Sequence, residues 1–216
     1  MFNWKDISMA GIILLAVVFF TCKKSNLQAS IYSPENRAST YVKTNETFAS
    51  FASINYTNYS EKSIVNWITF EEAYNLCKLK PRPIMVDIYT TWCGPCKMMS
   101  SQTFNNPEIA KYINDNFYAV KFDAESKDSV KFDKYTFVSS DPTNPKAPHH
   151  FAASILDNNL AYPSVVFLSN QIQRLDIIRG FIPPKNFEPI LKYYGSGDYQ
   201  KLKWEEYEKT FQSSIK

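Results

Sequence analysis

The sequence predicts an α/β domain built on a central mixed sheet that helices flank. Short runs of branched and aromatic apolar residues alternate with helical patterns through most of the chain, which is typical of parallel βαβ units. The last two such runs follow one another with only a short turn between them, which indicates an antiparallel hairpin at the C-terminal end. The chain has 216 residues, 44% of them apolar, which suits one domain of this kind with tails.

The predicted domain opens with a capped helix and a buried strand. Thr69 and Glu72 fit a capping box, so a helix is expected to begin after Thr69 and to end before Pro81. Residues 84–90, IMVDIYT, form a short apolar run typical of a strand that is covered on both faces. Asp87 is unusual in such a run because a charged carboxylate is costly to bury, and we expect it to be neutral, paired or hydrated.

The remaining elements follow in chain order. Helical patterns begin at Cys96 and at Pro107, and a strand is predicted over residues 117–123. After these come a short helix, two strands, a closing helix and an amphipathic piece, in the segments FAASILDN, SVVFLS, RLDIIRG, 183–194 and the stretch with Trp204, Tyr207 and Phe211. The pattern predicts a domain over residues 63–195, followed by a C-terminal amphipathic helix over 196–216.

The N-terminal segment, residues 1–22, is predicted to be an export signal. Its apolar run, residues 9–21, is shorter than the roughly 20 residues that a membrane-spanning helix needs. The run ends at Cys22 and resembles a bacterial lipoprotein signal, in which this cysteine is lipidated, although the preceding Phe-Phe-Thr is bulkier than usual. The alternative is an uncleaved anchor. Both interpretations tether the chain to a membrane and place it outside the cytoplasm, in the periplasm or cell envelope, where disulfides persist.

Residues 23–62 are predicted to be a flexible tether. The segment is rich in Ser, Asn, Thr and Tyr and has no clear period. An additional strand or helix packed on the domain is the alternative interpretation of this segment.

The charge and the supply of metal ligands argue against two classes of function. The net charge is +3, from 24 basic and 21 acidic residues, and no block of Lys or Arg is longer than two, so nucleic acid is not an expected partner. Two histidines and four cysteines are few ligands for a metalloenzyme, and we expect no metal site. His149 and His150 are expected to lie at a solvated helix start.

Cys93 and Cys96 enclose a Gly-Pro pair at the predicted junction between a strand and a helix. A structural zinc site needs four ligands, and the adjacent His149 and His150 have poor geometry for completing one. A static disulfide across so short a loop adds little stability. A redox centre is favoured because the N-terminus of a helix stabilises a thiolate on Cys93.

Residues 86–97, VDIYTTWCGPCK, resemble the active-site stretch of the thioredoxin family. WCGPC matches the family without change, and Asp87 lies six residues before Cys93, as the family's buried aspartate does. Lys121 matches the family's lysine beside that aspartate, and Tyr162-Pro163 matches its cis-proline site. The resemblance covers residues 67 to about 194 and implies the thioredoxin fold.

The resemblance also implies roles for these residues. Cys93 is the exposed nucleophile that attacks a partner's disulfide, and Cys96 resolves the mixed disulfide. Asp87 moves the proton of Cys96 through water, and Lys121 tunes its charge. The alternative for Asp87 and Lys121 is a structural ion pair.

Contacts with the client are implied for five further positions. Pro163, held cis, sets the backbone of Tyr162 against the client for strand-like pairing. The surface around Cys93 is shaped by Trp92, Gly94 and Pro95. Trp92 could instead be a packing residue, and Tyr162 is bulkier than the residue that the family usually has before this proline.

Residues 126–148 are longer than the connection that the family has at this point. The segments VKF and YTF, on either side of Asp133-Lys134, are expected to pair as a small hairpin. An insertion beside an active site can select partners, and it can equally be decoration.

The function expected from these observations is that of an extracytoplasmic thiol–disulfide oxidoreductase. The Gly-Pro pair resembles the reducing branch of the family, so we expect the protein to take electrons from a thiol–disulfide donor in the membrane and to reduce disulfides of client proteins. No cofactor is expected beyond the Cys93–Cys96 disulfide. The alternatives are a copper- or metal-handling module that uses the two cysteines and a binding protein without catalysis.

Overall fold

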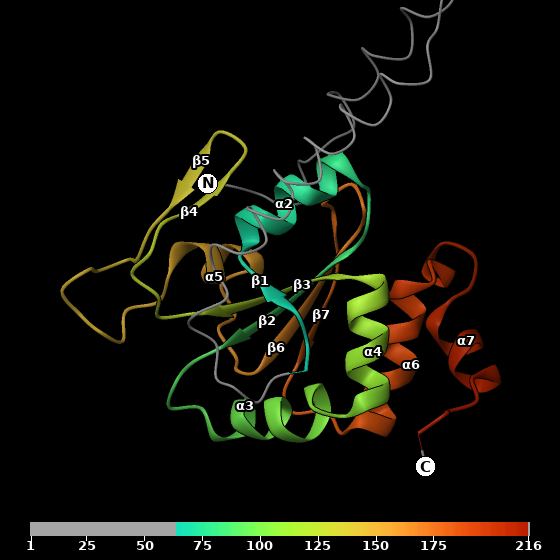
Figure 1. The fold of residues 1–216 in the computed structure, drawn as a ribbon. Helices are drawn as coiled ribbons and strands as arrows, with labels where there is room; N and C mark the ends of the chain where they lie inside the picture. Colours follow the sequence, from blue (N-terminus) through green and yellow to red (C-terminus); the bar gives the residue numbers. More distant parts are fainter. Residues whose placement is uncertain (1–63, 216) are drawn as a thin grey trace, which may run out of the picture. The chain divides into compact units, whose positions relative to one another are not determined.

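The computed structural model describes residues 64–215 (Figure 1). The predicted export signal with Cys22 and the predicted tether over 23–62 lie outside the described residues and stay predictions. Within residues 64–215, no helix combines the length and the apolar character needed to cross a membrane.

A five-stranded mixed sheet forms the centre of the domain. Its strands, in spatial order, are β1 (Trp67–Ile68), β3 (Tyr118–Asp123), β2 (Ile84–Tyr89), β6 (Ser164–Leu168) and β7 (Arg174–Arg179). β1 and β2 run parallel to β3, whereas β6 is antiparallel to β2 and β7 is antiparallel to β6. This arrangement confirms the predicted mixed sheet with a C-terminal hairpin, and its strand order and helical crossover are those of the thioredoxin fold.

Helices cover both faces of the sheet (Figure 1). The helical elements of the described chain are α2 (Phe70–Leu79), α3 (Gly94–Met98), the π-helix η4 (Met99–Phe104), α4 (Pro107–Asn116), α5 (His150–Ile155), α6 (Pro184–Gly195), the 3-10 turn η5 (Asp198–Gln200) and α7 (Trp204–Thr210). The last two, η5 and α7, pack against α6. Alternate residues of β2 divide between two cores. Ile84, Val86 and Ile88 pack with α2 and α5, while Met85 packs with η4, α4 and α6.

The start of α2 confirms the predicted capping box. The Thr69 hydroxyl accepts a hydrogen bond from the Glu72 backbone N–H at 3.2 Å, and the Thr69 N–H donates to Glu72 Oε2 at 2.9 Å. The helix ends at Leu79, just before the proline that was expected to limit it. Cys77 lies on the buried face of α2, and its thiol donates to the Arg82 carbonyl oxygen at 3.2 Å.

The helix predicted from Cys96 is interrupted soon after it begins. Only five residues are α-helical, and the backbone then widens into η4, in which the Asn105 N–H reaches the Ser100 carbonyl at 3.2 Å. The Thr103 hydroxyl anchors this turn by donating to the Ile182 carbonyl at 2.6 Å. Such π segments often occur at functional sites. Here the wider turn changes which residues face the sheet.

The insertion forms the predicted hairpin. Its strands are β4 (Val130–Phe132) and β5 (Tyr135–Phe137), and they pair antiparallel. The Phe132 ring packs edge-on against Phe70 at 5.6 Å and against Tyr74 at 5.1 Å, so the hairpin shares the hydrophobic core of α2. The insertion is therefore a packed part of the domain.

The expectation of a solvated helix start at His149 is wrong. His149 is fully buried and caps α5, where its Nδ1 accepts from the Phe151 backbone N–H at 3.0 Å. Its Nε2 must then carry the proton, which it donates to the Asp128 carbonyl at 2.9 Å. Burial lowers the pKa of this imidazole, consistent with a neutral ring that ties the insertion to α5. His150 is exposed, as expected.

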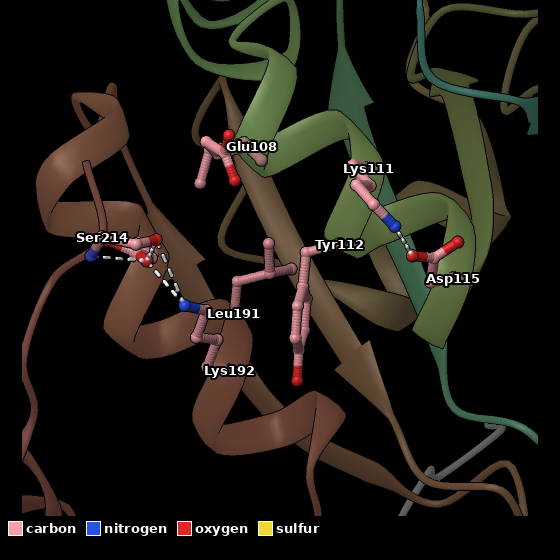
Figure 2. Close-up of a pocket in the computed structure, with 9 residues that line it drawn as sticks. Glu108, Lys111, Tyr112, Asp115, Leu191, Lys192 and Ser214 are labelled. Atoms are coloured by element: carbon pink, nitrogen blue, oxygen red, sulfur yellow. Dashed lines mark hydrogen bonds and ion pairs between the residues drawn. The ribbon is translucent and has the colours of Figure 1, made fainter.

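The prediction of one helix over 196–216 is also wrong in extent. The segment comprises η5, the seven-residue α7 and an extended tail that returns to α6. The buried carboxylate of Glu188 holds this tail, since it accepts hydrogen bonds from Lys192 Nζ at 2.7 Å and from the Ser214 N–H at 3.1 Å. Lys192 and Ser214 converge beside the pocket that α4 and α6 line (Figure 2). Burial by itself would raise the pKa of Glu188, but the hydrogen bonds to its carboxylate have the larger effect and lower the pKa to about 2.

We predict that Glu188→Gln lowers the free energy of unfolding by about 1–3 kcal/mol at neutral pH, because it removes a charged acceptor of several hydrogen bonds. The pKa of Glu188 falls from 4.5 to about 2 on folding, so its stabilisation is present above about pH 4.5 and is lost as the pH falls toward 2. Urea unfolding at several pH values measures the effect. Glu108→Gln, an exposed carboxylate on the rim of the same pocket, is the control, and an equal loss in both variants would contradict the prediction.

Candidate active site

Two cysteines lie where β2 ends and α3 begins. Cys93 is the N-cap of α3, and its sulfur accepts a hydrogen bond from the Cys96 backbone N–H at 3.1 Å. Pro95 lies in the first turn, where a missing N–H costs nothing. The two cysteines form a disulfide in this structure. The helix N-terminus therefore points its amides at Cys93, as the sequence predicted.

The expectation that Cys93 is exposed is wrong for this oxidised form. Only 3% of Cys93 is accessible, against 6% of Cys96. The surface above the disulfide is made by exposed neighbours, since Trp92 is 58% accessible and Gly94 and Pro95 are also exposed. The Cys93 sulfur is held at the start of α3 by its disulfide bond to Cys96 and by the hydrogen bond from the Cys96 N–H.

Asp87 lies in the middle strand of the sheet and is buried. It is opposite Lys121 of β3 on one side and Val165 of β6 on the other. Lys121 Nζ is 3.9 Å from Oδ2, and among the described residues Oδ1 has no hydrogen-bond partner. Burial raises the pKa of the Asp87 carboxyl to about 7, against the opposing effect of the Lys121 charge. The carboxyl can therefore exchange a proton near neutral pH.

The ammonium group of Lys121 has several neighbours. It donates a hydrogen bond to Ser100 Oγ of η4 at 3.1 Å. It also lies over the ring of Tyr89 at 5.1 Å and over that of Trp67 at 5.5 Å, distances at which cation–π attraction operates. Sequence reasoning did not find Ser100, because an α-helical reading of this segment misses the wider turn of η4.

The segment Tyr162-Pro163 lies at the same end of the sheet. The peptide bond between these residues is cis, and the Pro163 carbonyl accepts from the Gly180 N–H at 2.8 Å. Ser164 pairs with Ile88, near the end of β2 from which the chain continues to Cys93. The sheet thereby brings the proline segment and the two cysteines to one edge.

A carboxylate that the sequence did not reveal completes this edge. The indole N–H of Trp92 donates to both carboxylate oxygens of Glu125 at 3.0 Å, and its ring meets Tyr162 edge-on at 6.3 Å. Burial raises the pKa of Tyr162 to about 12, and the charges of Glu125 and Asp123 add to the effect. Glu125 follows the end of β3, which runs parallel to β2. Its position after a strand end was the feature of the sequence that could have indicated a place near Trp92.

The structure brings most of the predicted site residues together. The contacts join Trp92 to Tyr162, Asp87 to Lys121, and Cys93 to Cys96 across Gly94 and Pro95, and Ser164, which follows Pro163, pairs with the strand that carries Asp87. Cys22 lies outside the described residues. In the part of the chain that the structure covers, no group of three or more His, Cys, Asp or Glu side chains could hold a metal ion.

Comparison with known proteins gives matches to this region. Residues 46–140 match the model of the family Thioredox_DsbH, described as a protein of unknown function, DUF255. Chloroplastic thioredoxin Y of Oryza sativa subsp. japonica is 31% identical over 97 residues, which cover 43% of this chain and 55% of that protein. Over this region the chain is similar to proteins of the thioredoxin-like family.

The chain has further matches among known proteins and solved structures. Spermatogenesis-associated protein 20 of Mus musculus is 32% identical over 77 residues, which cover 35% of this chain and 10% of that protein. The chain therefore spans from about a tenth to about half of the length of these relatives. A thioredoxin-fold protein from Helicobacter pylori is 20% identical, with a TM-score of 0.46 and coverage of 58% of this chain and 76% of that one. The fold assignment rests on the strand order described above.

We predict that Asp87→Asn stabilises the oxidised thioredoxin-like domain above neutral pH. Because the pKa of Asp87 rises from 3.8 to about 7 on folding, the wild-type domain loses stability as the pH rises through this window. The gain in the variant should reach on the order of 2–4 kcal/mol at high pH and vanish below about pH 4. Urea unfolding across this range measures it. Asp115→Asn, at an exposed carboxylate, is the control, and a gain independent of pH would contradict the assignment.

We predict that Glu125→Ala frees the Trp92 indole. Loss of about 1 kcal/mol of hydrogen bonding corresponds to roughly fivefold faster exchange of its N–H with solvent. NMR of the indole region measures this rate. The control is Glu206→Ala, which removes an exposed carboxylate on α7 and should leave the exchange rate unchanged. An unchanged rate in Glu125→Ala as well would contradict the prediction.

Proposed function

We propose that this chain is an extracytoplasmic thiol–disulfide oxidoreductase that reduces disulfides of client proteins. The observation that carries the proposal is the Cys93–Cys96 disulfide at a helix N-terminus, in the same domain as a buried carboxyl with a pKa near 7. The family matches support the same class of chemistry.

The exchange begins from the reduced protein. The Cys93 thiolate attacks one sulfur of a client disulfide, a bond forms between Cys93 and the client, and the other client sulfur leaves as a thiolate. The Cys96 thiolate then attacks Cys93, which forms the Cys93–Cys96 disulfide and releases the second client thiolate. Two electrons pass to the client, and the two thiolates take up protons. The Cys96 N–H, 3.1 Å from the Cys93 sulfur, favours the thiolate of Cys93.

Asp87 is proposed as the group that accepts the proton of Cys96. A base works best when its pKa lies near the working pH, and burial brings Asp87 to about 7. Oδ1, which no described residue engages, can accept a proton directly or from a water. Lys121 limits the rise of this pKa by its charge.

The client is proposed to bind across the edge that holds the disulfide. The exposed Trp92, Gly94 and Pro95 offer the contact surface, and the backbone of Tyr162 before Pro163 offers short strand-like pairing. Glu125 holds the Trp92 ring in this surface.

Delivery of electrons is proposed to come from a membrane protein of the thiol–disulfide type. The predicted export signal and lipidation of Cys22 would keep the domain near such a donor. No cofactor beyond the Cys93–Cys96 pair is required, because the electrons move between sulfurs.

Substitution of the two cysteines tests this function. Cys93→Ser is expected to lower the rate of insulin disulfide reduction by at least about a hundredfold, because the nucleophile of the first step is lost. Cys96→Ser should accumulate a mixed disulfide with the client, visible by mass spectrometry. Cys77→Ala, at a buried thiol away from the disulfide, is the control. Full activity of Cys93→Ser would overturn the mechanism.

The reduction potential of the pair tests the direction. A value near about −270 mV, in equilibrium with glutathione or dithiothreitol, is expected for a reductase. A value near about −120 mV would mean that the protein oxidises its clients. Absence of a reversible couple would favour a metal-handling or purely binding role.

A further inference from the structure

Ser100 lies against the ammonium group that faces Asp87. Lys121 Nζ donates to Ser100 Oγ at 3.1 Å, whereas Asp87 Oδ2 is 3.9 Å away, beyond normal hydrogen-bond distance. The Lys121 side chain is 12% accessible and that of Asp87 is 4% accessible, so water screens this pair little. The hydrogen bond of the lysine thus goes to a neutral hydroxyl, although a carboxylate is nearby.

The π-helix η4 holds Ser100 in this position. Its neighbours Met99, Thr103 and Phe104 are buried in the core, and Thr103 is bonded to Ile182 at 2.6 Å. The Ser100 carbonyl accepts from the Asn105 N–H in the wide turn. Ser101 is exposed, and its hydroxyl donates a hydrogen bond to the carbonyl of Met98, the last residue of α3, at 3.4 Å. Two adjacent serines therefore have different surroundings, and only Ser100 contacts Lys121.

We propose that Ser100 is a positioning residue for the thiol–disulfide exchange, because it draws the Lys121 ammonium away from Asp87 and thereby preserves that carboxyl as a proton acceptor. The effect of Ser100 on catalysis rests on the proposed function. Its structural content, a competition between a hydroxyl and a carboxylate for one ammonium group, can be tested without turnover.

Coulomb's law sets the direction and size of the effect. Without the Ser100 hydroxyl, the ammonium can move from 3.9 Å to ordinary ion-pair distance from Asp87. At an effective dielectric constant of about 20, this approach favours the charged carboxylate by about one pH unit. Asp87 would then stay charged to lower pH and would hold a proton less readily at neutral pH.

The groups around Asp87 that can carry a charge come from β2, β3 and the helix that follows β2. Lys121 of β3 is the charged group that acts on its pKa. The opposite residue on β6, Val165, has no charge, and Tyr89 lies on the strand of Asp87 itself. Cys93 and Cys96 of the following helix titrate only when reduced. The oxidised protein therefore isolates the effect of Ser100 on Asp87.

The test is a titration of the Asp87 carboxyl by carbon NMR in the oxidised full chain, kept in detergent micelles and assigned with Asp87→Asn. Ser100→Ala is expected to lower the midpoint by about one pH unit. Ser101→Ala should leave it unchanged, and Ser100→Thr, which keeps the hydroxyl, should restore it to near the wild-type value. In a Lys121→Met background, where the midpoint itself is higher, Ser100→Ala should have no effect.

Two results would overturn the inference. One is an unchanged or higher midpoint in Ser100→Ala, and the other is the same shift in the Lys121→Met background. Because the titration uses oxidised protein, either result rejects the role of Ser100 and leaves the proposed function intact. Failure of the wild-type protein to reduce disulfides would instead reject the function. In a functional protein, the pH profile of disulfide reduction by Ser100→Ala should move down by the same amount.

Discussion

The burial of one carboxyl group in the middle strand is the constraint on which the site depends. Asp87 lies between β3 and β6, where solvation cannot support its charge. Lys121 supplies an opposite charge, but its distance of 3.9 Å and its bond to Ser100 leave the compensation incomplete. Incomplete compensation leaves the pKa of Asp87 raised to about 7, as the proposed proton transfer requires, because full pairing would leave the carboxylate charged at neutral pH.

The rest of the site comes from segments that the sheet brings to one edge. α3 begins there with its amides directed at Cys93, and the Tyr162-Pro163 segment arrives before β6. Glu125, the residue just before the insertion, accepts a hydrogen bond from the Trp92 indole. The hairpin of that insertion shares the core of α2, and the buried His149 ties its loop to α5. The insertion is therefore packed into the domain next to the residue that contacts Trp92.

Sequence patterns predicted the elements whose causes are local. The capping box at Thr69, the buried strand with Asp87 and the hairpin around Asp133 each depend on residues within a few positions of one another. The π-helix and the burial of His149 were missed because tertiary contacts impose them. Thr103 meets Ile182, and His149 meets the carbonyl of Asp128, far along the chain in each case.

The sequence by itself determined the chemistry available to this protein. Two cysteines at a strand–helix junction and a carboxylate in an apolar strand are local facts, and they predict a redox centre with a perturbed acid. Only the tertiary structure decided how that acid is tuned. Ser100 and Lys121 are 21 residues apart, and Trp92 and Glu125 are 33 apart. No local period relates such positions, and the order of strands in the sheet together with the wide turn of η4 sets the distances between them.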